Sequence, residues 1–288
     1  MNKLIDYNSP ASLKNFLESR EMAMQKKFGQ NFLINASARE KLTDMLDVKE
    51  GTRVWEVGPG LGALTAPVLK RGATVKAFEI DRGFANALGD IFAPETEEGR
   101  FLIVLGDVLK TWKKEAAESL PDRFCGNLPY NIAATIIADT ISEGIRFDRC
   151  VFTIQKEVAL RMTAQPGTSD YSSFSVLCQW AYDITPIIDL SGGSFWPRPN
   201  VDSRAVLFTK KENFPNCKSP EHFMKLQRSL FVSRRKTIKN NLSKFYSSNE
   251  KAEEILQLAG IDASIRAEKL DVATLLHLSD ISLENGGA

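Results

Sequence analysis

The chain of 288 residues has little of what several kinds of functional site require. Only two histidines occur, His222 and His277, so a histidine-based metal site or a Ser-His-Asp triad is poorly supported. The four cysteines include no C-x-x-C pair, which favours reduced, buried thiols. There is no apolar run of about 18 residues and no apolar core of a signal peptide. We therefore expect no metal and no membrane span, and we predict a cytoplasmic location.

Net charge is also small, but the charge is distributed unevenly. The whole chain carries a formal charge of +1, whereas residues 210–248 contain ten Lys or Arg and two Glu. This local excess of eight positive charges indicates a polyanionic partner that binds one face of the protein. A solvated helix surface is the alternative that the charge pattern alone leaves open.

Short apolar runs alternate with helical patterns between residues 50 and 160. Stretches rich in Val, Ile and Phe predict strands at 52–57, 74–80, 101–105, 123–126 and 150–154. This alternation predicts an α/β fold with a Rossmann-like, doubly wound and mostly parallel sheet. Two further strands, at 184–190 and 204–209, are expected to form a hairpin at the edge of the sheet.

The pattern changes at the end of this region. Residues 210–220 are polar and contain two prolines, as in a linker, and only helical patterns follow, at 221–231, 236–245, 249–258 and 272–278. We therefore predict two domains. Residues 1–209 form the first, with an N-terminal arm at 1–50, and residues 210–288 form a small, basic, all-helical domain.

A glycine-rich loop follows the first predicted strand. In EVGPGLGA (56–63), Gly58 and Gly60 let the backbone approach a ligand closely. Glu79 and Asp107 follow the next two strands, where they are placed to accept hydrogen bonds from ribose hydroxyls and from an adenine amino group. Together these residues predict a nucleoside pocket, and they leave both NAD and S-adenosylmethionine open as the cofactor.

The tetrapeptide Asn127-Leu128-Pro129-Tyr130 follows the fourth strand and separates these two cofactors. The amide oxygen of Asn127 and the carbonyl oxygen of Leu128 are suited to accept the two N–H groups of an exocyclic amine and to orient its nitrogen for methyl transfer. Pro129 fixes the loop, and Tyr130 offers a flat surface for a base that has left its stack. Hydride transfer has no need of such a site. We therefore predict these four residues as catalytic and S-adenosylmethionine as the methyl donor.

On these residues the chain resembles the ribosomal RNA small-subunit adenine dimethyltransferases, over about residues 24–245. The resemblance rests on motifs that occur in order along the chain: FGQNFL (28–33), EVGPGLGALT (56–65), EID (79–81), GD (106–107), GNLPYNIA (126–133), QKEVALRM (155–162), FWPRPNVDS (195–203) and RRKTIKNNL (234–242). It implies methylation of the N6 amines of two adjacent adenosines in a hairpin loop near the 3′ end of 16S rRNA, with a role in small-subunit biogenesis.

The resemblance also implies roles for individual residues. Around S-adenosylmethionine it places Asn31, Leu33, Gly58, Gly60, Glu79, Asp107 and Asn127. It implies that Phe195 lies opposite Tyr130, across the target adenine. The basic stretch then gives the residues expected to bind rRNA, which are Arg234, Arg235, Lys236 and Lys239. We expect the small ribosomal subunit as the partner and a monomeric enzyme.

Two other functions fit parts of the same pattern. A large-subunit rRNA adenine methyltransferase that confers antibiotic resistance shares the glycine loop and the Asn-Leu-Pro-Tyr type of motif. The motifs FWPRPNVDS and RRKTIKNNL fit the small-subunit group better. A non-catalytic ribosome assembly factor of the same fold is the third possibility. The presence of Asn127, Tyr130, Glu79 and Asp107 argues against it, because a pure binding protein has no use for an amine-orienting site.

Overall fold

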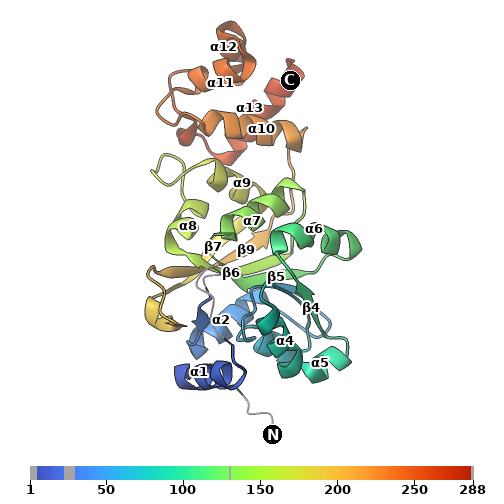
Figure 1. Ribbon diagram of the computed structural model, residues 1–288. Coiled ribbons are helices and arrows are strands. Elements are labelled where there is room, and N and C mark those ends of the chain that lie inside the picture. The colour runs from blue at the N-terminus through green and yellow to red at the C-terminus, as the bar shows by residue number, and fades with distance from the viewer. Residues whose placement is uncertain (1–4, 23–29, 130, 287–288) are drawn as a thin grey trace. The chain divides into compact units, whose positions relative to one another are not determined.

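The computed structural model describes residues 5–22, 30–129 and 131–286 (Figure 1). Its α-helices are α1 (Pro10–Ser19), α2 (Ala36–Leu46), α3 (Thr65–Lys70), α4 (Arg82–Ile91), α5 (Ala93–Glu97), α6 (Val108–Glu118), α7 (Ala133–Ser142), α8 (Lys156–Met162), α9 (Ser173–Ala181), α10 (Pro220–Phe231), α11 (Ile238–Tyr246), α12 (Asn249–Leu258) and α13 (Val272–Glu284). Its strands are β1 (Phe32–Leu33), β2 (Arg53–Val57), β3 (Thr74–Glu79), β4 (Phe101–Leu105), β5 (Arg123–Asn127), β6 (Arg149–Gln155), β7 (Tyr182–Leu190), β8 (Phe195–Trp196) and β9 (Ser203–Lys210).

Seven strands form one sheet in the order β4-β3-β2-β5-β6-β9-β7. The five strands β2 to β6 are parallel to their neighbours, and β9 runs antiparallel to β6. The prediction of a mostly parallel α/β sheet is therefore confirmed. The last two strands of the sheet, β9 and β7, are neighbours at its edge as expected, but they are not joined as a simple hairpin, because β8 lies between them in the chain and pairs with β1 in a separate two-stranded sheet.

The central strands are covered by apolar side chains on both faces, as expected for parallel strands with helices on either side. In β2, the residues Val54, Trp55 and Val57 are each at most 2% exposed. Trp55 packs against Phe78 of β3 and Phe124 of β5 at ring-centroid distances of 5.0 and 6.1 Å. Since parallel strands end at the same edge, this packing brings the loops after β2, β3, β4 and β5 together.

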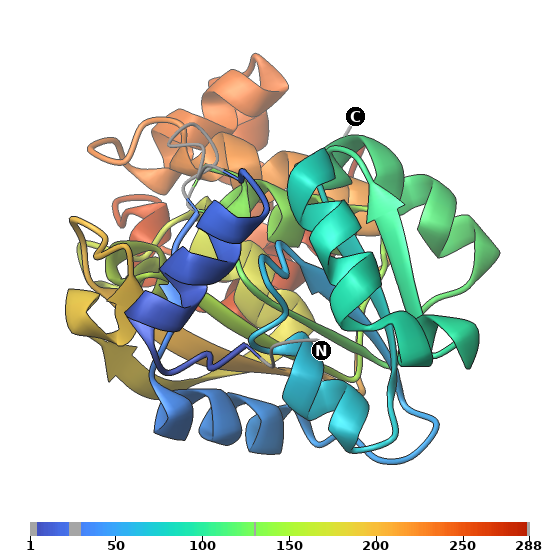
Figure 2. The same ribbon diagram turned by 60° about the horizontal axis from the view of Figure 1, so that its bottom comes forward.

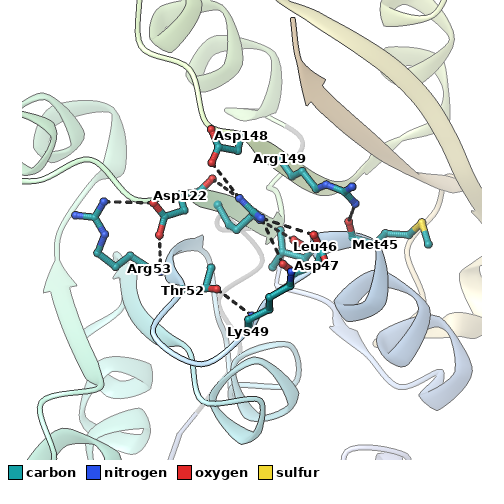
Figure 3. A network of polar contacts seen from close by, with 10 residues as sticks. Met45, Leu46, Asp47, Lys49, Thr52, Arg53, Asp122, Asp148 and Arg149 are labelled. Atoms are coloured by element: carbon teal, nitrogen blue, oxygen red, sulfur yellow. Dashed lines mark hydrogen bonds and ion pairs between the residues drawn. The ribbon is translucent and has the colours of Figure 1, made fainter. Parts of the chain in front are cut away.

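The opposite edge of the sheet, where these strands begin, is held by a polar network (Figure 3). The Arg123 guanidinium donates from Nε to the carbonyl oxygen of Leu46 at the end of α2, and its Nη1 lies 3.3 Å from Oδ2 of Asp148. Arg53 pairs with Asp122 at 3.3 Å, and the Asp122 carboxylate also accepts the backbone N–H of Arg53. These contacts join α2 to the first residues of β2, β5 and β6.

The N-terminal helix α1 adds a second, smaller apolar cluster to the sheet core. Ser9 caps the helix by accepting the N–H of Ser12, and a proline occupies its first turn. Its buried side chains Leu13 and Leu17 cluster with Leu61, Phe84 and two further buried apolar residues near the glycine loop. Figure 2 brings α1, in dark blue, to the front. The sequence analysis assigned these residues only to an N-terminal arm.

Contacts along the chain divide it into two compact units. Unit 1 comprises residues 1–137, 147–159 and 185–209, and unit 2 comprises residues 138–146, 160–184 and 210–288. From residue 220 to residue 286, the described part of unit 2 forms helices α10 to α13 and a short 3-10 turn and no strand, which confirms the helical C-terminal region. The division into domains at residues 209 and 210 stays a prediction. No helix in the described ranges is both long enough and apolar enough to span a bilayer.

Candidate active site

A cavity of about 280 Å³ opens in unit 1 at the carboxyl ends of β2 to β5. Its lining includes all seven residues expected around the cofactor: Asn31, Leu33, Gly58, Gly60, Glu79, Asp107 and Asn127. The loops come from four strands and from the segment around β1, which lie far apart in the sequence. Only the parallel sheet brings them to one place.

The glycine loop is shaped by close contacts that exclude larger side chains. Gly60 has φ +61°, and a Cβ at this position would lie 3.0 Å from the ring of Phe32. Phe32 belongs to β1 and lines the same cavity. The loop is fixed further by Tyr7, whose hydroxyl donates to the carbonyl oxygen of Leu61 at 2.9 Å. Its backbone therefore forms one wall of the cavity at a defined position.

Glu79 ends β3 and is buried, with 5% of its surface exposed. Its Oε1 accepts the backbone N–H of Asp81 at 2.9 Å. Burial raises the pKa of Glu79 to about 7, although backbone N–H groups, including that of Gly60, act in the opposite direction. A buried carboxyl group with a raised pKa is stabilised in its ionised form by a ligand that donates hydrogen bonds from hydroxyls or carries positive charge.

Glu56 is a second buried carboxyl group in the same cavity, and the sequence pattern did not single it out. It is 2% exposed, and Thr65 Oγ1 donates to its Oε2 at 2.7 Å. Burial raises the pKa of Glu56 to about 7, the hydrogen bond from Thr65 lowers it, and the charge of Glu79 raises it further. Within the described residues, neither Glu56 nor Glu79 forms an ion pair. Among the described residues, these two buried carboxyl groups of the cavity therefore have no cationic partner.

Asp107 combines a structural contact with a place in the cavity. It caps α6, since its Oδ1 accepts the backbone N–H of Leu109 at 3.0 Å, and it also lines the cavity. Capping and ligand binding are compatible because a carboxylate has several acceptor positions. Its contact with an adenine amino group stays a prediction.

The loop after β5 presents Asn127 at the edge of the cavity. Gly126 precedes it because a Cβ there would lie 2.5 Å from the carbonyl oxygen of Val57. The Nδ2 group of Asn127 donates to the backbone carbonyl oxygen of Asn31 at 2.8 Å. Since the amide nitrogen points toward Asn31, the amide oxygen points away from it and is left as an acceptor.

The rest of this loop is held on both sides. The backbone N–H of Leu128 donates to the carbonyl oxygen of Thr153 on β6 at 3.0 Å, and Leu128 itself is 1% exposed. Pro129 lines the cavity, and its carbonyl oxygen accepts the N–H groups of Ile132 and Ala133 at the start of α7. Tyr130 lies outside the described residues, so its predicted stacking role stays a prediction.

A model of the family described as ribosomal RNA adenine dimethylase matches residues 22–283. The chain belongs to this family. It is 48% identical over 280 residues to a Treponema denticola protein named ribosomal RNA small subunit methyltransferase A, covering 96% of this chain and 95% of that protein. Membership makes the chain an rRNA adenine dimethylase and a methyltransferase that depends on S-adenosylmethionine, which removes the nicotinamide alternative.

Solved structures support the fold of this dimethylase. A dimethyladenosine transferase from Plasmodium falciparum has a TM-score of 0.74 at 24% identity, covering 88% of this chain and 97% of that one. The 23S rRNA methyltransferase ErmE has a TM-score of 0.66 at 22% identity, covering 86% and 98%. At these identities the likeness shows the shared fold alone, so the second structure gives no support for a large-subunit substrate.

The structure does not bring Phe195 into the cavity of the dimethylase. Phe195 is 3% exposed in the core of the sheet, and its backbone pairs with that of Leu33. Its neighbour Trp196 is less buried and stacks on Phe32 at a centroid distance of 6.1 Å. The stacking of Phe195 on a target adenine stays a prediction, and it requires movement of the ring out of the core.

The predicted rRNA-binding residues belong to unit 2, and the structure corrects their arrangement. The sequence predicted helices at 221–231 and 236–245, whereas α10 ends at Phe231 and α11 begins only at Ile238, so Arg234, Arg235 and also Lys236 lie in the turn between them. The helix begins after Lys236 because Thr237 caps α11, its side chain accepting the backbone N–H of Asn240. These three basic side chains are exposed.

Two of the four basic residues have acidic partners within unit 2. Arg234 Nη2 lies 3.0 Å from Oε2 of Glu268, and Lys239 Nζ lies 2.8 Å from Oε2 of Glu253. For Arg235 and Lys236, the described residues offer no ion pair. These two side chains are therefore the members of the set that are available to phosphate groups without loss of an existing contact.

Proposed function

We propose that this dimethylase transfers methyl groups from S-adenosylmethionine to the N6 amines of two adjacent adenosines in a hairpin loop near the 3′ end of 16S rRNA, and thereby takes part in small-subunit biogenesis. The close relative named as a small-subunit methyltransferase supports this substrate. The single observation that carries the proposal is the Asn127 amide, whose nitrogen donates to the carbonyl oxygen of Asn31 and whose oxygen has no donor among the described residues.

The cavity residues fit the proposed cofactor. Glu79 would accept hydrogen bonds from the ribose hydroxyls, and Asp107 would accept one from the adenine amino group. The backbone near Gly58 would lie against the rest of the cofactor molecule. Two buried carboxyl groups that have no cationic partner among the described residues suit a molecule that carries a sulfonium and an ammonium group. When bound, S-adenosylmethionine supplies an activated methyl group, so we expect no metal to take part.

The chain's own contribution to chemistry is to orient the amine. The free oxygen of Asn127 and the carbonyl oxygen of Leu128 would each accept one N–H of the adenine amino group. This fixes the direction of the nitrogen lone pair and stabilises the tetrahedral nitrogen that forms during transfer. No general base is required, because the nitrogen loses its proton readily once it is positively charged.

Unit 2 would bind the rRNA backbone through its basic turn. Arg235 and Lys236 are exposed and carry no ion pair among the described residues, which supports a role in binding phosphates. We further propose that the enzyme acts as a monomer in the cytoplasm, where small subunits are assembled.

A methyl-transfer assay tests the proposal directly. Wild-type protein is incubated with labelled S-adenosylmethionine and one of three substrates: small subunits that lack the modification, naked 16S rRNA or naked 23S rRNA. We expect two dimethylated adenosines near the 3′ end of 16S rRNA, detected by mass spectrometry of RNA fragments. Transfer to 23S rRNA alone would identify the large-subunit activity, and tight binding of small subunits without any transfer would indicate an assembly factor.

A further inference from the structure

Arg39 is a buried cation in unit 1 that the site described above does not use. It lies on α2, is 8% exposed, and donates to three oxygen atoms of uncharged groups. Nη1 contacts the carbonyl oxygens of Leu33 at 2.8 Å and Tyr7 at 3.5 Å, and Nη2 contacts Oδ1 of Asn8 at 2.5 Å. Because burying a charge is costly, a guanidinium held by neutral acceptors indicates a specific positional role.

These acceptors belong to two segments that Arg39 joins. The first is the N-terminal segment, residues 5–22, which contains Tyr7 and Asn8. The second is residues 30–35, named here the strap. The N-terminal segment lies against the glycine loop through the hydrogen bond from Tyr7 to Leu61 and through the apolar cluster that includes Leu13. Arg39 therefore connects a segment that fixes the glycine loop with the strap.

The strap in turn contacts the catalytic amide. Its β1 residues pair with β8, and the N–H of Ile34 donates to the carbonyl oxygen of Ser194 at 2.9 Å. Two residues before Leu33, the carbonyl oxygen of Asn31 accepts the Nδ2 group of Asn127. This hydrogen bond decides which end of the amide faces the cavity, since an Asn side chain turned by 180° would present its nitrogen there instead.

We propose that Arg39 is a positioning residue for methyl transfer, which holds the strap so that the Asn31 carbonyl keeps the oxygen of Asn127 directed at the target amine. The inference rests on the proposed function, because it assigns a task to the amine-orienting residue. The N-terminal segment then holds both the glycine loop of the cofactor pocket and, through Arg39, the strap that orients Asn127. A displacement of the strap by about 1 Å is enough to matter, since misplacement on that scale costs up to about a hundredfold in rate.

The test compares Arg39→Met with Arg20→Met at saturating S-adenosylmethionine. Methionine keeps the apolar stem of Arg39 and removes its donors. Arg20 belongs to the same N-terminal segment, but its ion pair with Asp90, at 2.6 Å, does not involve the strap. We expect kcat to fall about tenfold or more in Arg39→Met, with unchanged affinity for small subunits, and to stay within about twofold of wild type in Arg20→Met. Partial recovery of kcat in Arg39→Lys, which keeps one donor group, would support positioning by hydrogen bonds.

Controls separate positioning from general loss of stability. Phe147→Leu weakens the aromatic core around Trp55 and Phe124 without touching the strap. An equal fall in kcat in this variant at an equal loss of melting temperature would overturn the proposal, as would an Arg39→Met enzyme with kcat within twofold of wild type. If Arg39→Met does not fold, Asn8→Ala removes one acceptor at an exposed residue, and an unchanged kcat there would contradict the proposal.

A second measurement does not depend on the substrate. Hydrogen exchange at the N–H of Ile34 reports how firmly the strap pairs with Ser194. We expect faster exchange in Arg39→Met than in Arg20→Met, and equal rates would show that Arg39 does not hold the strap. If wild-type protein methylates none of the three RNA substrates while this difference in exchange remains, the proposed function fails and the link between Arg39 and the strap stands.

Discussion

Replacing Glu79 with Gln should stabilise the cofactor-free protein above neutral pH and weaken cofactor binding at the same time. Burial raises the pKa of Glu79 from 4.5 to about 7 in the folded chain. Between these values the folded protein keeps a proton that the unfolded chain has lost, so the free energy of unfolding falls as pH rises and levels off above about pH 7. At about 1.4 kcal/mol per pKa unit, this amounts to roughly 3 kcal/mol.

A glutamine at this position carries no ionisable proton and can still accept the N–H of Asp81. The variant should therefore match wild type near pH 5 and exceed it by up to about 3 kcal/mol at pH 8. The gain includes a smaller effect at Glu56, because the charge of Glu79 raises the pKa of that carboxyl group too. Urea unfolding at pH 5, 6, 7 and 8 measures the difference. Glu118→Gln, at an exposed position of α6, is the matched control.

The cofactor side of this prediction has its own pH dependence. S-adenosylmethionine is positively charged and should bind best to the ionised form of Glu79, so the wild-type affinity should rise with pH up to about 7 and then stay level. The Gln variant should bind more weakly, by roughly ten- to hundredfold, with less pH dependence. Stability curves of wild type and variant that run parallel from pH 5 to 8 would refute the reasoning, because they would show that Glu79 titrates alike in the folded and unfolded chain.

Two further predictions address chemistry and RNA binding separately. Asn127→Ala should lower kcat by about a hundredfold or more and leave affinity for small subunits within about twofold, because the amide acts on one amino group in the transition state; a parallel loss of RNA affinity would make Asn127 structural. Replacing Arg235 and Lys236 with Glu should weaken small-subunit binding and make its affinity less dependent on salt, by the amount expected for the loss of about two phosphate contacts. The affinity for S-adenosylmethionine should not change. Replacing Lys218 and Lys251 of unit 2 with Glu is the control. An equal effect in this variant would show that the basic turn contributes only to the overall charge and does not contact phosphates specifically.

The sheet was predictable because its strands are short, apolar and separated by helical patterns. The predicted strands at 52–57 and 101–105 differ by at most one residue from β2 and β4. Strands β1 and β8 were not predictable, since each has only two residues and forms through pairing with the other. The helix α2 was also missed, because no strong apolar period marks it apart from its surroundings. Tertiary packing determines such elements, and local sequence carries little of that information.

The same distinction applies to the candidate site. Glu79 and Asp107 were predictable because the carboxyl ends of parallel strands meet at one edge of a sheet. Asn31 and Leu33 came only from the family resemblance. Arg39 and Tyr7 had no signal at all, because their importance depends on contacts between segments that are more than 30 residues apart in some cases.

The two edges of the sheet use carboxyl groups in opposite ways. Where the strands begin, Asp122 and Asp148 lie beside Arg53 and Arg123 (Figure 3). Partial burial acts to raise the pKa of Asp122, but hydrogen bonds from Arg53 hold it below its usual range. Where the strands end, the described residues leave Glu56 and Glu79 buried with no cation, and the pKa of each rises to about 7.

A buried carboxyl group with a raised pKa lowers the free energy of unfolding at neutral pH. A cationic ligand in the cavity would stabilise the ionised carboxylate and so offset this loss. An Arg or Lys side chain placed beside these carboxyl groups would stabilise the cofactor-free protein, but it would compete with the cofactor for the same acceptor atoms. Among the described residues Glu79 has no cationic partner, which supports its proposed role as an acceptor for the cofactor, whereas the ion pair with Arg53 makes Asp122 part of the framework.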